Sequence, residues 1–181
     1  MTQKDILALA IKAGFTAAAP LNPDTIQLKQ DVRQMCADGN CGMYGKRWSC
    51  PPGCGSLEEC NENILGYPSG ILVQTTGKIE DSFDFEGMQE IEAKHKQCFQ
   101  VMHASLTKYF AHLLPLGAGC CTICKVCTYP EQPCRFPEKM VSSMEAYGML
   151  VTEVCKSNNL PYYYGPNTMT YTSCFLYSEQ T

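Results

Sequence analysis

Four cysteines in the second half of the chain are spaced like the ligands of a metal cluster. The segment reads Cys121-Thr-Ile-Cys124-Lys-Val-Cys127, and a fourth thiol follows at Cys134. A tight loop can aim three thiolates at three corners of one multi-iron cluster, and a later cysteine fills the fourth corner, as in bacterial-type ferredoxins. The spacing therefore predicts a single [4Fe–4S] cluster held by these four cysteines.

Zinc and metal-free thiols are the alternative interpretations of this segment. A structural zinc site usually joins two separate Cys-x2–4-Cys pairs. Here the two pairs share Cys124, and such overlapping pairs fit one small ion poorly. Redox-active thiols without a metal stay open as a third interpretation. Cys120 has no place in the spacing, and we interpret it as a neighbour of the ligands.

A first group of thiols lies earlier in the chain, at Cys36, Cys41, Cys50, Cys54 and Cys60. The opening step matches plant-type ferredoxins, but the next ligand of that pattern would fall on Tyr44, so the comparison fails. Glycines are frequent in this segment, and they free backbone N–H groups to point at anionic sulfur. The spacing predicts a bound cluster or metal, with a structural role for the thiols as the alternative, and leaves the fourth ligand open.

Basic residues flank both groups of thiols. Lys46 and Arg47 follow the first thiols of the early group, and Arg135 follows Cys134. These cations can offset the negative charge of ligated thiolates, although exposed basic residues are as a rule solvated surface. We keep both interpretations.

Composition indicates the expected location of the protein and the classes of partner that it is not expected to bind. The chain has 181 residues, a net charge of −4 and 13 cysteines, an odd number that excludes complete internal pairing. The first residues lack a secretory cleavage site, and no apolar run approaches the length of a membrane span. We therefore predict a soluble cytoplasmic protein, where thiols stay reduced. The absence of a Lys/Arg cluster argues against a nucleic-acid or membrane partner.

The elements expected to position the early loop follow from apolar periodicity and capping residues. We expect a helix from the Thr2 cap to Gly14, another from Asn22-Pro23 to Cys36, a short helix after Ser56, a strand over 70–76 and a long helix over about 84–113. The loop with the first thiols lies between the second and third of these helices.

The rest of the chain completes a mixed α+β (α/β) fold. A capping box at Ser142-Ser-Met-Glu145 predicts a helix, and strands are expected over 161–164 and 171–177 around a turn. We predict one compact domain over residues 1–181, with a small mixed sheet, several helices and two cysteine-rich metal-binding loops. Periodicity predicts four buried, non-ligating side chains: His95, Cys98, Cys155 and Cys174. Tyr162 to Tyr164 are expected to pack on the sheet.

The chain also resembles a known family, through motifs in both halves. The early motifs are Val32-Arg33, Cys36, Cys41, Tyr44-Gly45-Lys46, Trp48, Cys50-Pro51-Pro52, Gly55 and Glu58-Glu59-Cys60. The later ones are Gly119, Cys121, Cys124, Cys127, Pro133-Cys134-Arg135, Pro137, Ser143-Met144-Glu145-Ala146, Gly148 and Pro166-Asn167-Thr168. In these residues the chain resembles the DUF2284 family, a domain family of unknown function described as predicted metal-binding.

The resemblance implies two sets of four thiolates. The first is Cys36, Cys41, Cys50 and Cys60, and the second is Cys121, Cys124, Cys127 and Cys134. It chooses Cys60 over Cys54 as the fourth ligand of the first set. It implies no activity, because the family is described by metal binding alone.

Three functions are compatible with these features. The first is a protein with two [4Fe–4S] clusters that passes electrons to or from a partner redox enzyme, since such contacts are small, transient and steered by charge. The second is a redox enzyme in which one cluster keeps an open iron for substrate. The third is a zinc-stabilised interaction module, in which metal binding supplies folding free energy. No catalytic residue and no oligomeric state is predicted.

Overall fold

A five-stranded mixed sheet forms the framework of the protein. The computed structural model describes residues 1–39 and 41–178. The strands are β1 (Ala17–Leu21), β2 (Ser69–Lys78), β3 (His112–Gly117), β4 (Ser142–Ser143) and β5 (Thr168–Ser178), in the spatial order β1-β2-β5-β3-β4. Only β3 and β4 pair in parallel within this sheet; the other neighbours are antiparallel. The predicted mixed α+β fold with a small mixed sheet is confirmed.

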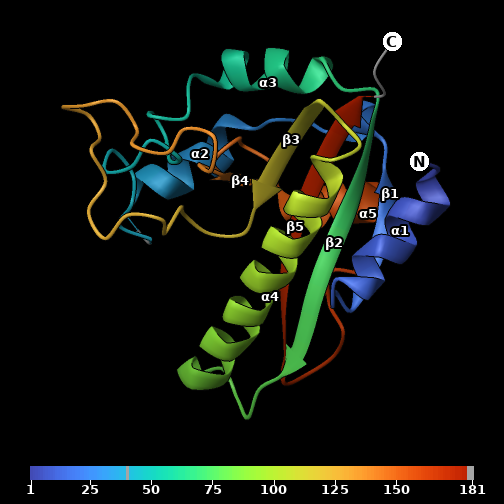
Figure 1. Ribbon diagram of the computed structural model, residues 1–181. Coiled ribbons are helices and arrows are strands. Elements are labelled where there is room, and N and C mark those ends of the chain that lie inside the picture. Colours follow the sequence, from blue (N-terminus) through green and yellow to red (C-terminus); the bar gives the residue numbers. More distant parts are fainter. Residues whose placement is uncertain (40, 179–181) are drawn as a thin grey trace.

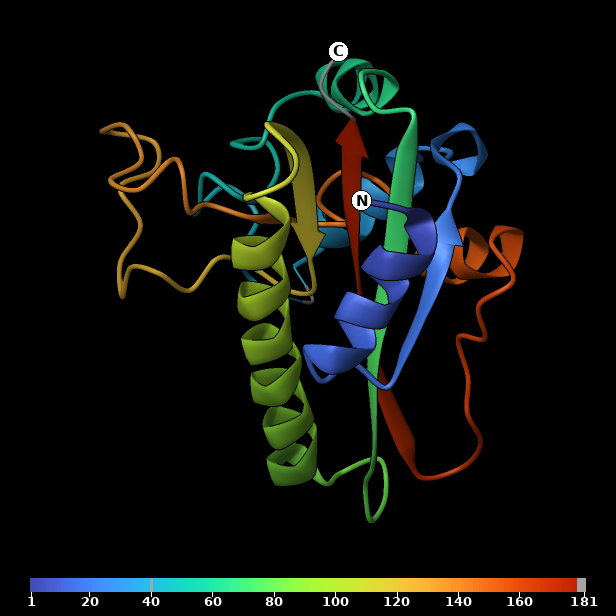
Figure 2. The ribbon, with the colours of Figure 1, turned by 45° about the vertical axis from the view of Figure 1, so that its right-hand side comes forward.

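Helices cover both faces of the sheet (Figures 1 and 2). One face packs against α1 (Gln3–Lys12) and α4 (Phe85–Leu106), and the other against α3 (Leu57–Leu65) and α5 (Val151–Ser157). No helix in the described residues is long and apolar enough to cross a membrane. The helices instead bury their apolar stripes on the sheet.

The two central strands supply both halves of the core. Successive side chains of a strand point to opposite faces. Ile71 and Phe175 accordingly pack under α1 and α4, whereas Leu72, Cys174 and Leu176 pack on the other face, and all five are fully buried. The fold is therefore one layer of sheet between two layers of helices.

Two helix starts follow the predicted capping residues. Thr2 and Asp5 form a capping box at the start of α1, and Ser56 and Glu59 form another at the start of α3. Gly14, beyond the end of α1, has a φ of +105°, a conformation that glycine adopts without steric cost.

The long helix ends earlier than its apolar pattern predicts. It stops at Leu106, so the expected end near residue 113 is wrong, and residues 112–117 form β3. Phe110 continues the helical apolar stripe and is buried, but it lies in the turn after the helix. The backbone beyond it pairs with β5 from His112 to Leu116, which satisfies polar groups that the sheet would otherwise bury.

The helix predicted from Asn22-Pro23 to Cys36 is divided in two. Asn22 caps a short 3-10 helix, η1 (Pro23–Thr25), and α2 begins only at Gln30 and ends at Ala37. The interruption has a tertiary cause. Leu28 forms a β-bridge with Met149, and the Lys29 N–H donates to the Gly148 carbonyl at 2.8 Å.

Two predictions near the C-terminus need correction: the helix predicted after Ser142 begins only at Val151, with Val151 and Val154 buried, and residues 161–164 form no strand. Ser142 and Ser143 form β4, and the Ser143 hydroxyl accepts from the Ala146 N–H at 3.1 Å, so the capping interaction closes a turn instead of starting a helix. The segment 161–164 is not a strand, and its tyrosines are exposed. The strand expected over 171–177 lies within β5 and is confirmed.

Candidate metal centre

The two cysteine-rich loops form one structural unit beside the sheet. We call residues 41–56 and 118–141 the cysteine lobe. The first loop connects α2 to α3, and the second leaves the end of β3 and returns into β4. In Figures 1 and 2 the two loops extend together from the same side of the sheet. Thiols far apart in the sequence therefore lie in one region.

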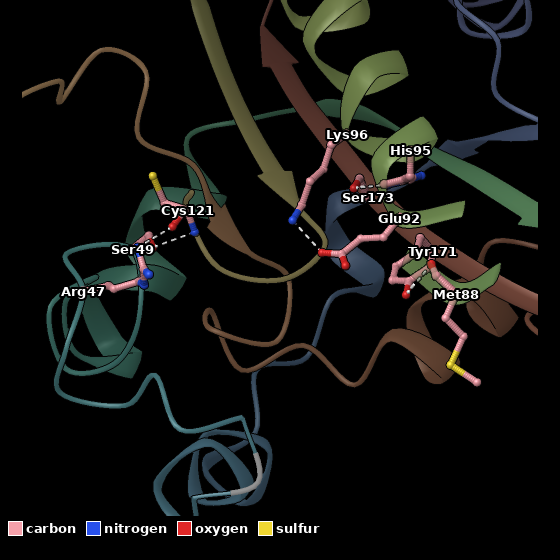
Figure 3. Close-up of polar contacts among 9 residues, drawn as sticks. All are labelled: Arg47, Ser49, Met88, Glu92, His95, Lys96, Cys121, Tyr171 and Ser173. Carbon is pink, nitrogen blue, oxygen red and sulfur yellow. Dashed lines mark hydrogen bonds and ion pairs between the residues drawn. The ribbon is translucent and has the colours of Figure 1, made fainter. Parts of the chain in front are cut away.

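Hydrogen bonds and an aromatic contact join the two loops. The Cys121 carbonyl accepts from Arg47 Nη1 at 2.8 Å, and the Cys121 N–H donates to Ser49 Oγ at 3.2 Å (Figure 3). Trp48 Nε1 donates to the Gln132 carbonyl at 3.0 Å. The Trp48 ring also meets Tyr129 edge to face, with 4.9 Å between ring centroids. Residues 47–49 thus hold the second loop in place.

The second loop brings its four predicted ligands around one small cavity. Among the residues that line it are all four thiols: Cys121, Cys124, Cys127 and Cys134. Arg47 and Arg135 line it as well, and Arg135 Nη1 is held by the Val126 carbonyl at 3.0 Å. Cys120, which the spacing left out, lines a larger pocket beside α4. The arrangement agrees with the spacing, although the ligand set itself stays a prediction.

Backbone groups around this cavity favour a thiolate. Burial tends to raise the pKa of Cys127, but hydrogen bonds from the backbone of Trp48, Tyr129 and Thr128 outweigh it and lower this pKa. N–H groups pointing at sulfur stabilise the ionised form that binds metal. One of these donors, Trp48, belongs to the first loop, so the contact between the loops also lowers the pKa of Cys127 in the second loop.

The first loop takes its thiols from several elements. Cys36 lies in the last turn of α2, Cys60 lies in α3, and the other three occupy the loop between them. Burial, followed by the neighbouring Cys41 thiol, raises the pKa of Cys36. Burial likewise raises the pKa of Cys50 to about 11, with Cys120, Cys41 and Cys54 adding to the effect. Neighbouring thiols thus disfavour one another's ionised form.

Cys54 has the most anion-stabilising surroundings of this group. The neighbouring Cys60 thiol is the largest cause that lowers the pKa of Cys54, and the Arg33 guanidinium also lowers it. Arg33 Nη2 lies 3.3 Å from Cys54 Sγ and 2.6 Å from the Gly55 carbonyl. The same contact with Cys54, together with burial, raises the pKa of Cys60. Cys54 is therefore the thiol of the pair that ionises first.

The chain matches the family described as "Predicted metal-binding protein" (DUF2284) over residues 19–177. It belongs to this predicted metal-binding family. The match spans both cysteine-rich loops and most of the sheet. No curated protein and no solved structure matches the chain. The expected family membership is confirmed, and metal binding is supported at the level of the family description.

In the described structure the side chains of this predicted metal-binding protein do not converge on one point. Among residues 1–39 and 41–178, no three Cys, His, Asp or Glu side chains lie close enough to share one ion. A zinc ion holds each thiolate at about 2.3 Å, so its ligands must crowd together. A cube-shaped iron–sulfur cluster spreads its ligands, because each thiolate binds a different iron.

Sequence reasoning missed two residues of this region. Arg33 was noted only within a family motif, although its position three residues before Cys36 places both on one side of a helix. Ser49 carries no signal of its own in the sequence. Of the cations that were considered, Arg47 and Arg135 line the second cavity, whereas Lys46 is exposed.

A larger pocket lies between α4 and the second loop. Its volume is about 490 Å³, and apolar side chains such as Phe99 and Val141 supply much of its wall. His95 and Ser173 lie at its inner side, with 2.6 Å between His95 Nε2 and Ser173 Oγ (Figure 3). Cys121 lines both this pocket and the small cavity of the four thiols. The pocket is thus next to the second candidate metal site.

Proposed function

We propose that this protein carries two [4Fe–4S] clusters and transfers electrons to or from a partner redox enzyme. The observation that carries the proposal is the cavity lined together by Cys121, Cys124, Cys127 and Cys134. Such clusters accept and release single electrons at potentials set by hydrogen bonds to sulfur, net charge and exposure. The second cluster is assigned to these four thiols, and the first to Cys36, Cys41, Cys50 and Cys60, the set that the family resemblance implies.

The contact between the loops supports a role in electron transfer. Ser49 and Arg47 bind the backbone of Cys121, and Cys50 follows Ser49 directly. A ligand of the first site and a ligand of the second therefore lie on either side of a single hydrogen-bonded contact. Two redox centres placed side by side form a path along which an electron can cross the protein.

Charge around the sites supports an anionic cofactor. Arg47 and Arg135 line the second cavity, and Arg33 binds Cys54 in the first loop. Iron–sulfur clusters ligated by four thiolates carry net negative charge, which buried or half-buried guanidinium groups stabilise. A net charge of −4 for the chain suits a transient, electrostatically steered contact with a redox partner.

Metal analysis of protein purified without oxygen tests the proposal. We expect about eight irons and about eight acid-labile sulfides per chain, with a brown absorption band that dithionite bleaches. About four of each would reduce the proposal to one cluster. Zinc without sulfide, in a colourless protein, would replace it with the zinc-stabilised interaction module.

The pocket beside α4 favours a redox enzyme as the second candidate function. Its volume of about 490 Å³ lies within the range of small-molecule sites, about 300–1,000 Å³. A molecule in this pocket would lie beside Cys121, and hence beside the second site. An enzyme of this kind needs an iron with an open coordination position. Cyanide added to the reduced protein should then change its EPR spectrum, whereas an unchanged spectrum excludes this function.

A further inference from the structure

The least compensated charge in the described structure lies next to the first group of thiols. The Arg33 side chain is only 7% exposed, and its Nε has no hydrogen-bond partner among the described residues. The guanidinium forms no ion pair with a carboxylate in this part of the chain; exposed Glu58 interacts with it at longer range. A buried cation with an unsatisfied donor is costly unless an anion is bound beside it.

The groups around Arg33 indicate what that anion is. Arg33 Nη2 donates to Cys54 Sγ at 3.3 Å, and Cys36 lies one helical turn further along α2. Cys54 is also tied to Cys50, because its N–H donates to the Cys50 carbonyl at 3.1 Å and closes one turn of backbone. Cys36 and Cys54 thus approach Arg33 from two segments, and Cys50 is joined to Cys54 through the backbone.

Cys60 is placed differently. It is 2% exposed and belongs to the apolar core cluster that includes Leu21 and Ile64. The Cys60 thiol donates to the Cys54 carbonyl at 3.6 Å, and the Cys54 thiol donates to the Ala146 carbonyl at 3.5 Å, but of the two only the Cys54 sulfur accepts from the Arg33 guanidinium.

We propose that Cys54, rather than Cys60, is the fourth ligand of the first cluster, and that Arg33 is the buried cation that balances this cluster. The proposal rests on the proposed function and revises the ligand set implied by the family resemblance. Cys36, Cys41, Cys50 and Cys54 hold the cluster. Cys60 supports it from the core, with its thiol against Cys54. Each ligand releases its thiol proton when it binds iron.

Single substitutions of Cys54 and Cys60 test the ligand assignment. Cys54→Ala should lose about half of the iron and sulfide of the wild-type protein, as expected when one of two equal clusters is lost. Cys60→Ala should keep the full content, because a small apolar side chain can replace a buried thiol. The opposite pattern, loss in Cys60→Ala with full content in Cys54→Ala, overturns the proposal.

The second cluster is the internal control in these variants. If Cys54→Ala retains the EPR signal of one cluster and the far-ultraviolet circular dichroism of the wild type, its loss of iron is local. If Cys60→Ala loses both iron and the wild-type circular dichroism, a second variant, Cys60→Val, is measured, because valine keeps a side chain that fills the core. Full iron content in Cys60→Val supports the proposal, and half of the wild-type iron content overturns it. Zinc without sulfide in the wild type would contradict the proposed function. The ligand assignment would still be tested, because loss of zinc in Cys54→Ala but not in Cys60→Ala would support it and the opposite pattern would overturn it.

The role of Arg33 is tested by reduction potentials. Arg33→Met keeps an apolar stem of similar length and removes the charge, so the reduced state of the nearby cluster loses stabilisation. The potential of one of the two EPR signals should move to more negative values, and the other should stay in place. Arg33→Lys should show a smaller shift, because it retains the charge. Equal shifts of both signals, or none, would overturn this role.

Discussion

The sheet scaffold and the cysteine lobe are stabilised in different ways. The scaffold buries Phe175, Ile71 and Leu72 completely, and its buried His95 is held between Thr75 and Ser173. In the lobe, no residue from 118 to 141 is buried, residues 41–56 bury only Ser49, Cys50 and Pro51, and neither loop contains a helix or strand. Apolar packing and satisfied polar groups account for the scaffold, but the lobe has no core of its own.

The difference indicates what the metal does for the protein. A segment without a core needs another source of stability, and metal–thiolate bonds at the proposed sites would supply it, because the free energy of metal binding becomes folding free energy. Loss of metal should therefore loosen the lobe and leave the scaffold folded. The predictions below separate the two regions in order of decreasing effect.

The largest effect is expected from Cys124→Ala. Cys124 belongs to both overlapping Cys-x2-Cys pairs, so its removal should abolish the second cluster and reduce iron from about eight to about four atoms per chain. Amide exchange should accelerate across residues 118–141 and stay slow in β2 and β5. Cys120→Ala is the matched control, since Cys120 lies outside the four-thiol cavity, and it should keep its iron. Full iron in Cys124→Ala, or exchange that accelerates throughout the sheet, would contradict the division into two regions.

Phe175→Ala should have the converse effect. Phe175 is fully buried in β5 and stacks on Phe99 of α4, with 4.6 Å between ring centroids. Truncation of a buried phenylalanine typically lowers the free energy of unfolding by about 3–5 kcal/mol. Urea unfolding should report this loss, with Phe175→Leu as the milder control. The folded fraction should retain the wild-type ratio of iron to protein; a selective loss of iron would mean that the sheet tunes the metal sites directly.

Local chemistry is what the sequence predicts best in this molecule. The capping residues Thr2 and Ser56 and the regularly spaced thiols of the second loop all act on neighbours within a few residues. The structure places these helix starts as the capping residues indicate, and the four thiols line one cavity. Short-range geometry accounts for the helix starts, whereas the second loop is also held by residues 47–49 of the first.

Features that depend on tertiary contacts could not be predicted in the same way. The end of α4 is set by the pairing of β3 with β5, and the interruption before α2 by the bridge between Leu28 and Met149. The apposition of Arg33 and Cys54 arises because α2 packs against the turn after Cys50. The spacing of residues along the chain does not reveal these contacts. Spacing alone therefore could not identify the fourth ligand of the first loop.

His95 links the stability of the scaffold to pH. Burial lowers its pKa to about 4, whereas an unfolded histidine titrates near 6.5. Between these values the unfolded state binds the proton more readily, so stability is complete above about pH 6.5 and declines as the pH falls towards 4. Between pH 7.5 and pH 5 the loss should be about 2 kcal/mol.

The matched measurement compares urea unfolding of the wild type and His95→Gln at the two pH values. Glutamine keeps a hydrogen-bonding side chain but does not titrate, so the pH-dependent loss should be smaller in the variant by about the amount given above. Acid also affects metal–thiolate bonds, but that contribution is common to both proteins and cancels in the difference. An equal loss in both proteins would show that His95 is not the titrating group.

The smallest effect is expected at the contact between the two loops. Trp48→Phe keeps an aromatic ring against Tyr129 but removes the hydrogen bond from Nε1 to the Gln132 carbonyl. The carbonyl can turn to water, so the cost in stability should be about 0.5–1.5 kcal/mol, measured as faster amide exchange in residues 118–141.

Tyr109→Phe, an exposed aromatic substitution on the scaffold, is the control and should leave exchange unchanged. Because the lobe has no core, a single hydrogen bond is a large fraction of the interactions that join its two loops. The loss of stability should therefore be confined to the lobe. Faster exchange in β2 and β5 as well would mean that the loops and the sheet unfold as one cooperative unit.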